Sequence, residues 1–168
     1  MALRPWLAEY PSTIPHSIDP DTYESLVALF RARVAMYTEE PAFTNEGTTL
    51  TFGDVDRFSA AFAAFLSAQK SLRKGDRIAV MLPNLLQSPI AIIGVLRAGM
   101  VVVNVNPQYT PRELQHQLND SGAKAIVVLE NFAHTLARIV GETNVDTVIT
   151  TSVGDQHPIL KRWLIDFA

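Results

Sequence analysis

The chain has 168 residues, of which 48% are apolar and 18% are charged, and its formal net charge is −3. These proportions describe a globular domain with an apolar core, and they exclude a disordered chain and a protein that binds nucleic acid through a basic surface. The sequence contains no cysteine, which excludes disulfides and thiolate metal or redox sites.

Residues 1–22 are expected to be an irregular lead, because prolines recur at positions 5, 11, 15 and 20. This lead has no continuous apolar core, so a cleaved signal peptide is not expected. The most apolar run of the chain, Pro89 to Val103, contains Arg97 and two glycines and is too short and too interrupted to cross a bilayer. The sequence therefore predicts no transmembrane segment.

A helical spacing of apolar residues from Tyr23 to Tyr37 predicts the first helix, which ends before Pro41. Ala42–Asn45 and Thr48–Thr51 are expected to form a β-hairpin. Thr51 and Asp54 are spaced as a capping pair and predict the start of a second helix. Its buried face is expected to include Val55, Phe58, Phe62, Phe65 and Leu66, with the phenylalanines in the core.

From residue 77 onward, strands and helices alternate. The expected order is strand Arg77–Leu82, helix Leu85–Ala98, strand Val101–Val105, helix Pro111–Ser121, strand Ala125–Leu129, helix Asn131–Val140 and strand Thr147–Thr151. Short β-branched strands that alternate with helices require crossover connections, so the fold class is α/β, a parallel sheet flanked by helices. The expected α/β unit spans 23–156, and residues 157–168, amphipathic from 159 to 167, are expected to be a truncated linker or helix.

The residues by themselves indicate no catalytic machinery and no metal site. The sequence has no phosphate-binding loop, no dinucleotide fingerprint and no nucleophile elbow. The four histidines, His16, His116, His134 and His157, lack metal-ligand spacing. His116 and Asp120 share a helix face, where we expect a solvent-facing pair rather than a ligand pair.

Several segments, in register and in order, resemble a known family. Leu50–Val55 (L-T-F-G-D-V) and Leu96–Pro107 (L-R-A-G-M-V-V-V-N-V-N-P) resemble the first two core motifs of adenylate-forming enzymes, and Lys74–Val80 resembles the K-G-D-R-V-A strand between them. Asn104–Ala123, together with W-L-A-E-Y-P at 6–11 and N-F-A-H-T-L at 131–136, is similar to bacterial long-chain fatty acid:CoA ligases in particular.

The resemblance implies the N-terminal subdomain of an AMP-binding domain. The complete enzyme would use ATP, CoA and Mg²⁺ to convert a long-chain fatty acid through acyl-AMP to acyl-CoA, in the cytoplasm or peripherally at the inner face of the cell membrane. The family's phosphate loop, nucleotide-binding tyrosine and acid pair, and C-terminal lysine have no counterpart in this sequence. The chain is therefore expected to be an inactive fragment that binds no cofactor alone, with the remainder of the ligase chain as its partner.

Other readings share the early motifs. An acyl-AMP ligase and an aryl-CoA ligase belong to the same family, and a non-catalytic α/β dimerisation module belongs to a different class. A sheet that is part of a larger molecule leaves an unpaired strand edge and an apolar face, so we also expect self-association.

One loop is a candidate binding site, 104–112. It follows a parallel strand and precedes a helix N-terminus, where open α/β sheets bind ligands and where an anion is favoured. Some related CoA ligases carry a basic residue after the Asn-Pro, whereas this chain has Gln108, so Arg112 is the nearest cation. The resemblance makes Asn106, Gln108 and Arg112 candidate contacts to CoA, and the alternative is a capped loop with a surface charge.

Overall fold

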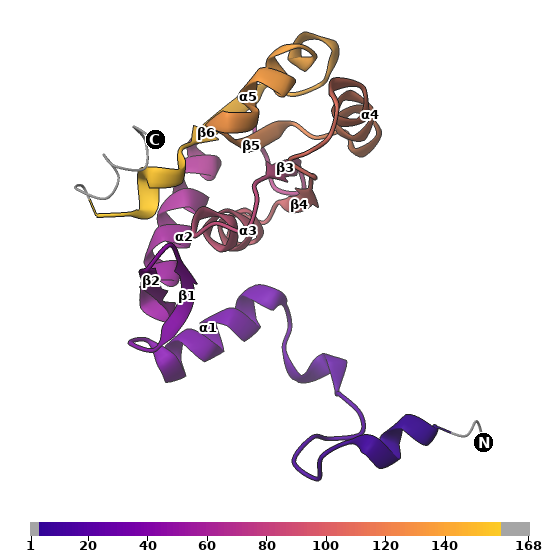
Figure 1. Ribbon diagram of the computed structural model, residues 1–168, viewed down its shortest axis with the longest axis vertical. Coiled ribbons are helices and arrows are strands. Elements are labelled where there is room, and N and C mark those ends of the chain that lie inside the picture. Colours follow the sequence, from indigo (N-terminus) through magenta and orange to yellow (C-terminus); the bar gives the residue numbers. More distant parts are fainter. Residues whose placement is uncertain (1–3, 159–168) are drawn as a thin grey trace.

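The computed structural model describes residues 4–158, and it contains one parallel sheet and one small hairpin (Figure 1). The parallel sheet has four strands in the spatial order β4-β3-β5-β6. The strands are β3 (Arg77–Met81), β4 (Val101–Asn104), β5 (Ala125–Leu129) and β6 (Thr147–Thr151). The α/β class with a parallel, helix-flanked sheet is thereby confirmed.

Helices connect successive strands and cover both faces of the sheet. They are α3 (Gln87–Arg97), α4 (Pro111–Ser121) and α5 (Glu130–Ala137). On one face, Ile78 and Val80 of β3 pack with residues of α3 and of a preceding helix, α2 (Phe52–Ala68). On the other face, Ala79 and Met81 pack with α4 and α5. Successive side chains of β3 therefore enter different cores, as the period of a strand requires.

The N-terminal part is attached through a third, smaller core. The predicted hairpin forms from β1 (Pro41–Asn45) and β2 (Thr48–Thr51) and turns at Glu46 (φ 46°) and Gly47 (φ 68°). Both turn residues are left-handed, as the primed hairpin turns require. Leu50 of β2 is buried with Val55 of α2 and with two residues at the start of α3.

Helix α1 (Leu26–Tyr37) contributes little to this core. Although it is rich in apolar residues, none of them is buried, and Leu26 and Met36 are among the most exposed large apolar side chains. Two short 3-10 helices, η1 (Pro5–Glu9) and η2 (Pro20–Thr22), precede it in a segment that extends away from the sheet (Figure 1).

The expectation that the phenylalanine row of α2 lies in the core is confirmed in part, since Phe58 and Phe62 pack against the core clusters, and it is wrong for Phe65. Phe65 is 46% exposed, and Phe58 and Phe62 are only half-buried. The buried stripe of α2 consists of Val55, Ser59, Ala63 and Leu66. Helix α3 approaches this stripe closely at Ser59, and the ring of Phe62 lies against the same helix.

Gly94 and Arg97 of α3 determine this close approach. A Cβ atom at Gly94 would lie 2.7 Å from Cδ1 of Phe62 and 3.1 Å from the carbonyl oxygen of Ser59, so only glycine fits without a shift. Nη1 of Arg97 donates to the carbonyl oxygen of Asp56 (3.0 Å), to the Asp56 carboxylate and to Oγ of Ser59 (3.2 Å). The guanidinium thus ties α3 to α2 at a largely buried contact.

Most predicted elements are present, with shifted ends. Helix α1 begins at Leu26 rather than Tyr23, α3 begins at Gln87 rather than Leu85, and α5 ends at Ala137 rather than Val140. The predicted stretch 159–167 lies outside the described residues, and the boundaries at 22/23 and 156/157 stay predictions. Within residues 4–158, no helix has the length and apolarity that crossing a membrane requires.

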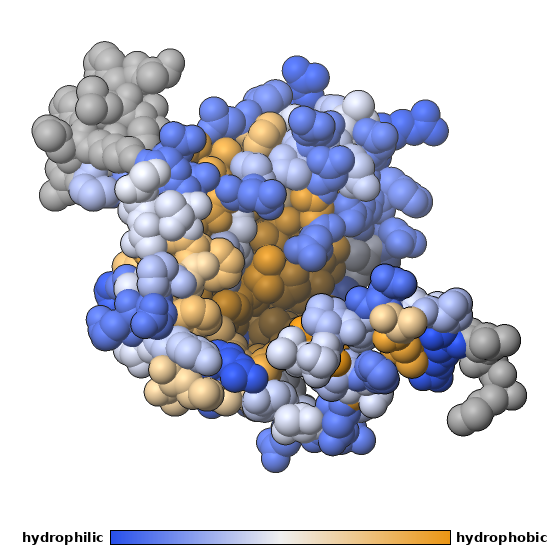
Figure 2. Space-filling model, turned by 60° about the horizontal axis from the view of Figure 1, so that its bottom comes forward, coloured by the Kyte–Doolittle hydropathy of each residue, from blue (hydrophilic) through white to orange (hydrophobic). Residues whose placement is uncertain are grey.

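The surface is not uniformly polar. On the face that Figure 2 presents, hydrophobic residues form the floor of a hollow and hydrophilic residues form much of its rim. Exposed apolar patches of this kind mark interaction surfaces. Apolar side chains on this face are therefore exposed, and no other described residue covers them.

The contact of Arg97 with α2 predicts a stability difference between two arginines. Arg97→Met removes the hydrogen-bond donor of Asp56 and Ser59 at a largely buried contact. We therefore expect a loss of about 1–3 kcal/mol in the free energy of unfolding. Its control is Arg57→Met, because Arg57 also pairs with an aspartate of α2 but has a 65% exposed side chain. The control should lose about 0–1 kcal/mol. Urea unfolding of both variants measures the difference, and equal losses would contradict the assignment.

Candidate functional site

The carboxyl ends of the four strands lie at the same edge of the sheet, where open α/β sheets bind ligands. After the central strand β3, the chain continues to β4 on one side, and β5 then pairs with β3 on the other side. The strand order therefore reverses at β3 and β5. The candidate loop 104–112 follows β4, an outer strand of the described sheet, and so lies one strand away from this reversal.

The loop has a defined turn at its centre. The backbone N–H of Val105 donates to the carbonyl oxygen of Val80 (3.0 Å), which continues the pairing with β3. Asn106 then organises the turn, since its Oδ1 accepts from the N–H of Gln108 (3.0 Å) and its carbonyl oxygen accepts from the N–H of Tyr109 (3.2 Å). The fold thus brings Asn106 and Gln108 together, and both are exposed.

The N-terminus of α4 carries the predicted capping box. The N–H of Glu113 donates to Oγ1 of Thr110 (3.4 Å), and the Glu113 carboxylate accepts from Oγ1 (2.7 Å) and N–H (2.9 Å) of Thr110. These hydrogen bonds lower the pKa of Glu113, so its carboxylate stays ionised. A negative charge already occupies the helix terminus, and the dipole argument for an anion at this point is weakened accordingly.

Arg112 is exposed in the first turn of α4. A second residue at this edge was not identified from the sequence. Nε2 of Gln117 donates to the carbonyl oxygen of Asn104 (3.0 Å) and so fixes α4 against the end of β4. Its Oε1 is buried and has no hydrogen-bond partner among the described residues. The sequence signal that could have indicated Gln117 is its place on the helix, directly before the buried Leu118 and three residues after the buried Leu114.

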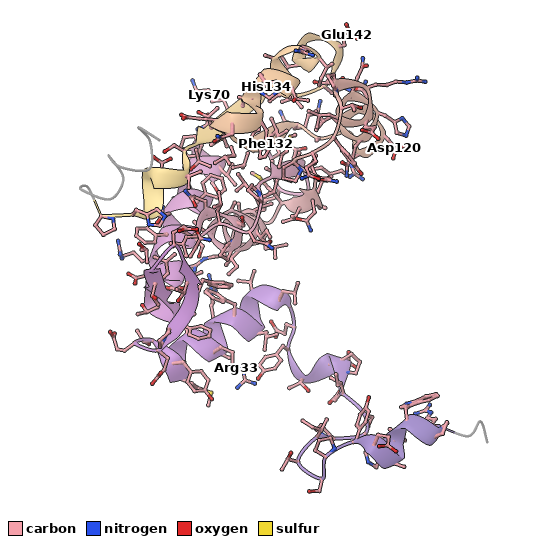
Figure 3. All side chains as sticks on the ribbon, viewed as in Figure 1. Arg33, Lys70, Asp120, Phe132, His134 and Glu142 are labelled. Atoms are coloured by element: carbon pink, nitrogen blue, oxygen red, sulfur yellow. The ribbon has the colours of Figure 1, made fainter. Side chains whose placement is uncertain are left out.

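Other titratable residues do not gather into a site. The labelled side chains of Figure 3 are spread from Arg33 on α1 to Asp120 on α4 and His134 on α5. Among residues 4–158, no group of three histidine or acidic side chains is positioned to hold a metal ion. The described residues consequently offer no ligand set for Mg²⁺, and no phosphate loop for ATP. For CoA they offer the exposed loop and Arg112.

Comparison with known proteins gives these features a context. The model of the AMP-binding enzyme family matches residues 30–168. A long-chain-fatty-acid–CoA ligase of Escherichia coli O157:H7 is 56% identical over 162 residues, which is 96% of this chain and 29% of that protein. The homologous protein of Haemophilus influenzae is 50% identical over the same share of both chains. The chain thus spans less than a third of the length of the curated relatives that it matches.

Solved structures agree on the fold. An anthranilate CoA ligase is 17% identical with a TM-score of 0.73 over 80% of this chain and 27% of its own length. A long-chain-fatty-acid–CoA ligase from Archaeoglobus fulgidus is 24% identical with a TM-score of 0.69 over 84% of this chain and 29% of its own length. The family model covers most of the sequence, and the sheet and its helices recur in these ligases. The chain therefore belongs to the AMP-binding enzyme family.

Proposed function

We propose that the chain is the N-terminal segment of an ATP-dependent long-chain fatty acid:CoA ligase. In this reaction a fatty carboxylate attacks the α-phosphate of ATP, and pyrophosphate leaves as acyl-AMP forms. The thiol of CoA then displaces AMP to give acyl-CoA. The adenylate divides one difficult acyl transfer into two easier steps, and Mg²⁺ would offset the phosphate charge in the complete enzyme.

The observation that carries this proposal is the 56% identity to a long-chain-fatty-acid–CoA ligase across 96% of the chain. The fold alone does not discriminate, because an anthranilate CoA ligase and a benzoate CoA ligase share it at 17% and 20% identity. An acyl-AMP ligase, an aryl-CoA ligase and a non-catalytic dimerisation module stay alternatives. The extent and level of the sequence identity favour the fatty acid.

A chimaera tests the proposal. We would replace the matching segment of the E. coli ligase with residues 1–168 and measure acyl-CoA formation from oleate. The chimaera should be active, because a segment of the same enzyme fits the remaining domains, whereas a folded but inactive chimaera would contradict the assignment.

The isolated 168-residue chain should show no ATP–pyrophosphate exchange, since it lacks the phosphate loop, and exchange above a buffer control would show that the segment is catalytic by itself.

We also propose that the loop with Asn106, Gln108 and Arg112 contacts CoA in the complete enzyme. Its position at the carboxyl edge of the sheet and the exposed guanidinium of Arg112 support this role. Because Glu113 occupies the helix terminus, the attraction for a phosphate would come from Arg112 rather than from the dipole.

Arg112→Ala in the active chimaera should raise the KM for CoA by about five- to thirtyfold, the loss of roughly 1–2 kcal/mol expected for one charge-assisted hydrogen bond. Acyl-AMP formation, assayed without CoA, should be nearly unchanged. Arg138→Ala is the control, because Arg138 is equally an exposed arginine but follows α5, away from the loop. Equal losses in both half-reactions would mean that the loop is scaffold.

We further propose that the isolated chain self-associates through the free edge of β6. Within residues 4–158, this strand pairs only with β5; it carries no charged or proline residue and exposes Val148 to 45%. An unprotected edge of this kind accepts another strand. Light scattering at tens of micromolar should give more than the monomer mass, and a strictly monomeric result would refute the association.

For the complete enzyme we propose a cytoplasmic location with peripheral association at the membrane.

A further inference from the structure

We propose that the amino edge of the parallel sheet, where its strands begin, binds an anionic phospholipid bilayer through five basic side chains. They are Lys70, Arg73, Lys74, Arg77 and Lys124, and we call them the basic edge. The inference rests on the peripheral membrane association proposed for the complete enzyme, and it names the surface that makes the contact.

Basic residues are concentrated immediately before β3. Residues 70–77 contain four Lys or Arg residues and one acidic residue, Asp76. Residues 4–51, by contrast, contain three arginines and seven acidic residues. The net charge of −3 is therefore the sum of opposite local charges, and a positive one lies at the start of the sheet.

The fold brings the fifth cation, Lys124, to the same place. Strands β3 and β5 are parallel neighbours, and the N–H of Lys124 donates to the carbonyl oxygen of Arg77 (2.8 Å). The turn before β3 is closed by Asp76, whose carboxylate accepts from the N–H of Arg73 (2.7 Å). Residues that are about 50 positions apart in the sequence thus form one edge of the molecule.

Two further contacts fix the lysines of the loop that precedes β3. Oγ of Ser71, next to Lys70, forms a hydrogen bond with Oγ1 of Thr147 (3.2 Å), the first residue of β6. Cγ of Lys74 lies 3.3 Å from the position that a Cβ atom on Gly99 would take. The aliphatic stem of Lys74 therefore packs on the chain after α3, while the residue itself stays exposed.

The charges of the basic edge are available to a partner. Four of its residues are exposed and Lys124 is half-buried. Both ion pairs among residues 4–158 belong to α2 and α3, so no residue of the basic edge is paired with a carboxylate of that part of the chain. Asp76, Asp146 and, at the end of α4, Asp120 are the acidic residues of the adjoining segments, and five cations outnumber these three carboxylates.

A basic cluster of this size suits a flat anionic surface, since patches of about four to eight Lys or Arg residues bind anionic lipid headgroups. The acidic segment 4–51 would be repelled by the same surface, and Figure 3 shows Arg33, which lies in that segment, well apart from Lys70. The sheet would thus approach the bilayer with the ends at which its strands begin. Loop 104–112 follows the opposite end of β4, so the candidate site would stay open to solvent and to CoA.

Vesicle binding of the 168-residue chain tests the proposal. The chain should sediment with vesicles that contain phosphatidylglycerol, and much less with vesicles of phosphatidylcholine alone. Binding should weaken when the salt concentration rises from about 0.1 M to about 1 M, because the screening length then falls from about 10 Å to about 3 Å.

Paired variants separate the basic edge from the net charge. Arg73→Gln with Lys74→Gln should weaken binding by roughly ten- to thirtyfold, because each basic residue at an anionic bilayer contributes about fivefold. The matched control is Arg31→Gln with Arg57→Gln, which removes the same charge from two exposed arginines outside the basic edge and should leave binding nearly unchanged. Equal losses in the two double variants would overturn the proposal, since binding would then follow the net charge alone.

The other outcomes are equally distinct. Equal binding to vesicles with and without phosphatidylglycerol would overturn the proposal in favour of the apolar face in Figure 2. Unchanged vesicle binding together with a lower mass in light scattering for Arg73→Gln with Lys74→Gln would overturn it in favour of the acidic segment of a second copy.

A second pair of substitutions leaves the turn before β3 intact. Lys70→Gln with Lys124→Gln should weaken vesicle binding by a similar factor, and unchanged binding would count against the basic edge as one surface. None of these measurements depends on catalysis, so their failure would leave the ligase assignment to be tested by the chimaera.

Discussion

The contact between α2 and α3 supports most of the N-terminal half of the molecule. Gly94 lets the two helices approach until a Cβ atom would collide with Phe62, and Arg97 joins them through Asp56 and Ser59. Helix α3 connects β3 to β4, and α2 carries the hairpin and α1. The same two helices share a core with the sheet, in which Ala63 and Leu66 of α2 pack with Ile78 and Val80 of β3.

The sequence was sufficient for the fold class and for most elements, because β-branched runs and capping residues are local signals. Thr110 with Glu113 and Thr51 with Asp54 form the capping boxes that their spacing indicates. The strand order was not accessible in the same way, since it depends on which side of β3 each crossover takes. The exposure of Phe65 was missed for a related reason, because only the structure shows which face of α2 lies against α3 and the sheet.

The candidate site, too, was predictable from the sequence only in part. The position of the loop after a parallel strand and the helix that follows it were predictable from pattern. The turn made by Asn106 and the bond from Gln117 to Asn104 depend on geometry. The carboxylate of Glu113 weakens the attraction of the helix dipole for an anion, so the proposal for the loop depends on Arg112. Sequence motifs located the loop, and the structure determined which of its atoms are available.

The pairing of β3 also has a consequence for synthesis on the ribosome. Strand β3 pairs with β4 on one side and with β5 on the other, and Ala125 of β5 lies opposite Ile78. The second neighbour is translated roughly 50 residues after β3, which takes about 3–10 s at ordinary elongation rates. During that interval, a strand that is buried on both faces in the finished molecule has one open edge and one uncovered face. The nascent chain is therefore most exposed to chaperones and to misassembly before α4 and β5 emerge, whatever the stability of the completed domain.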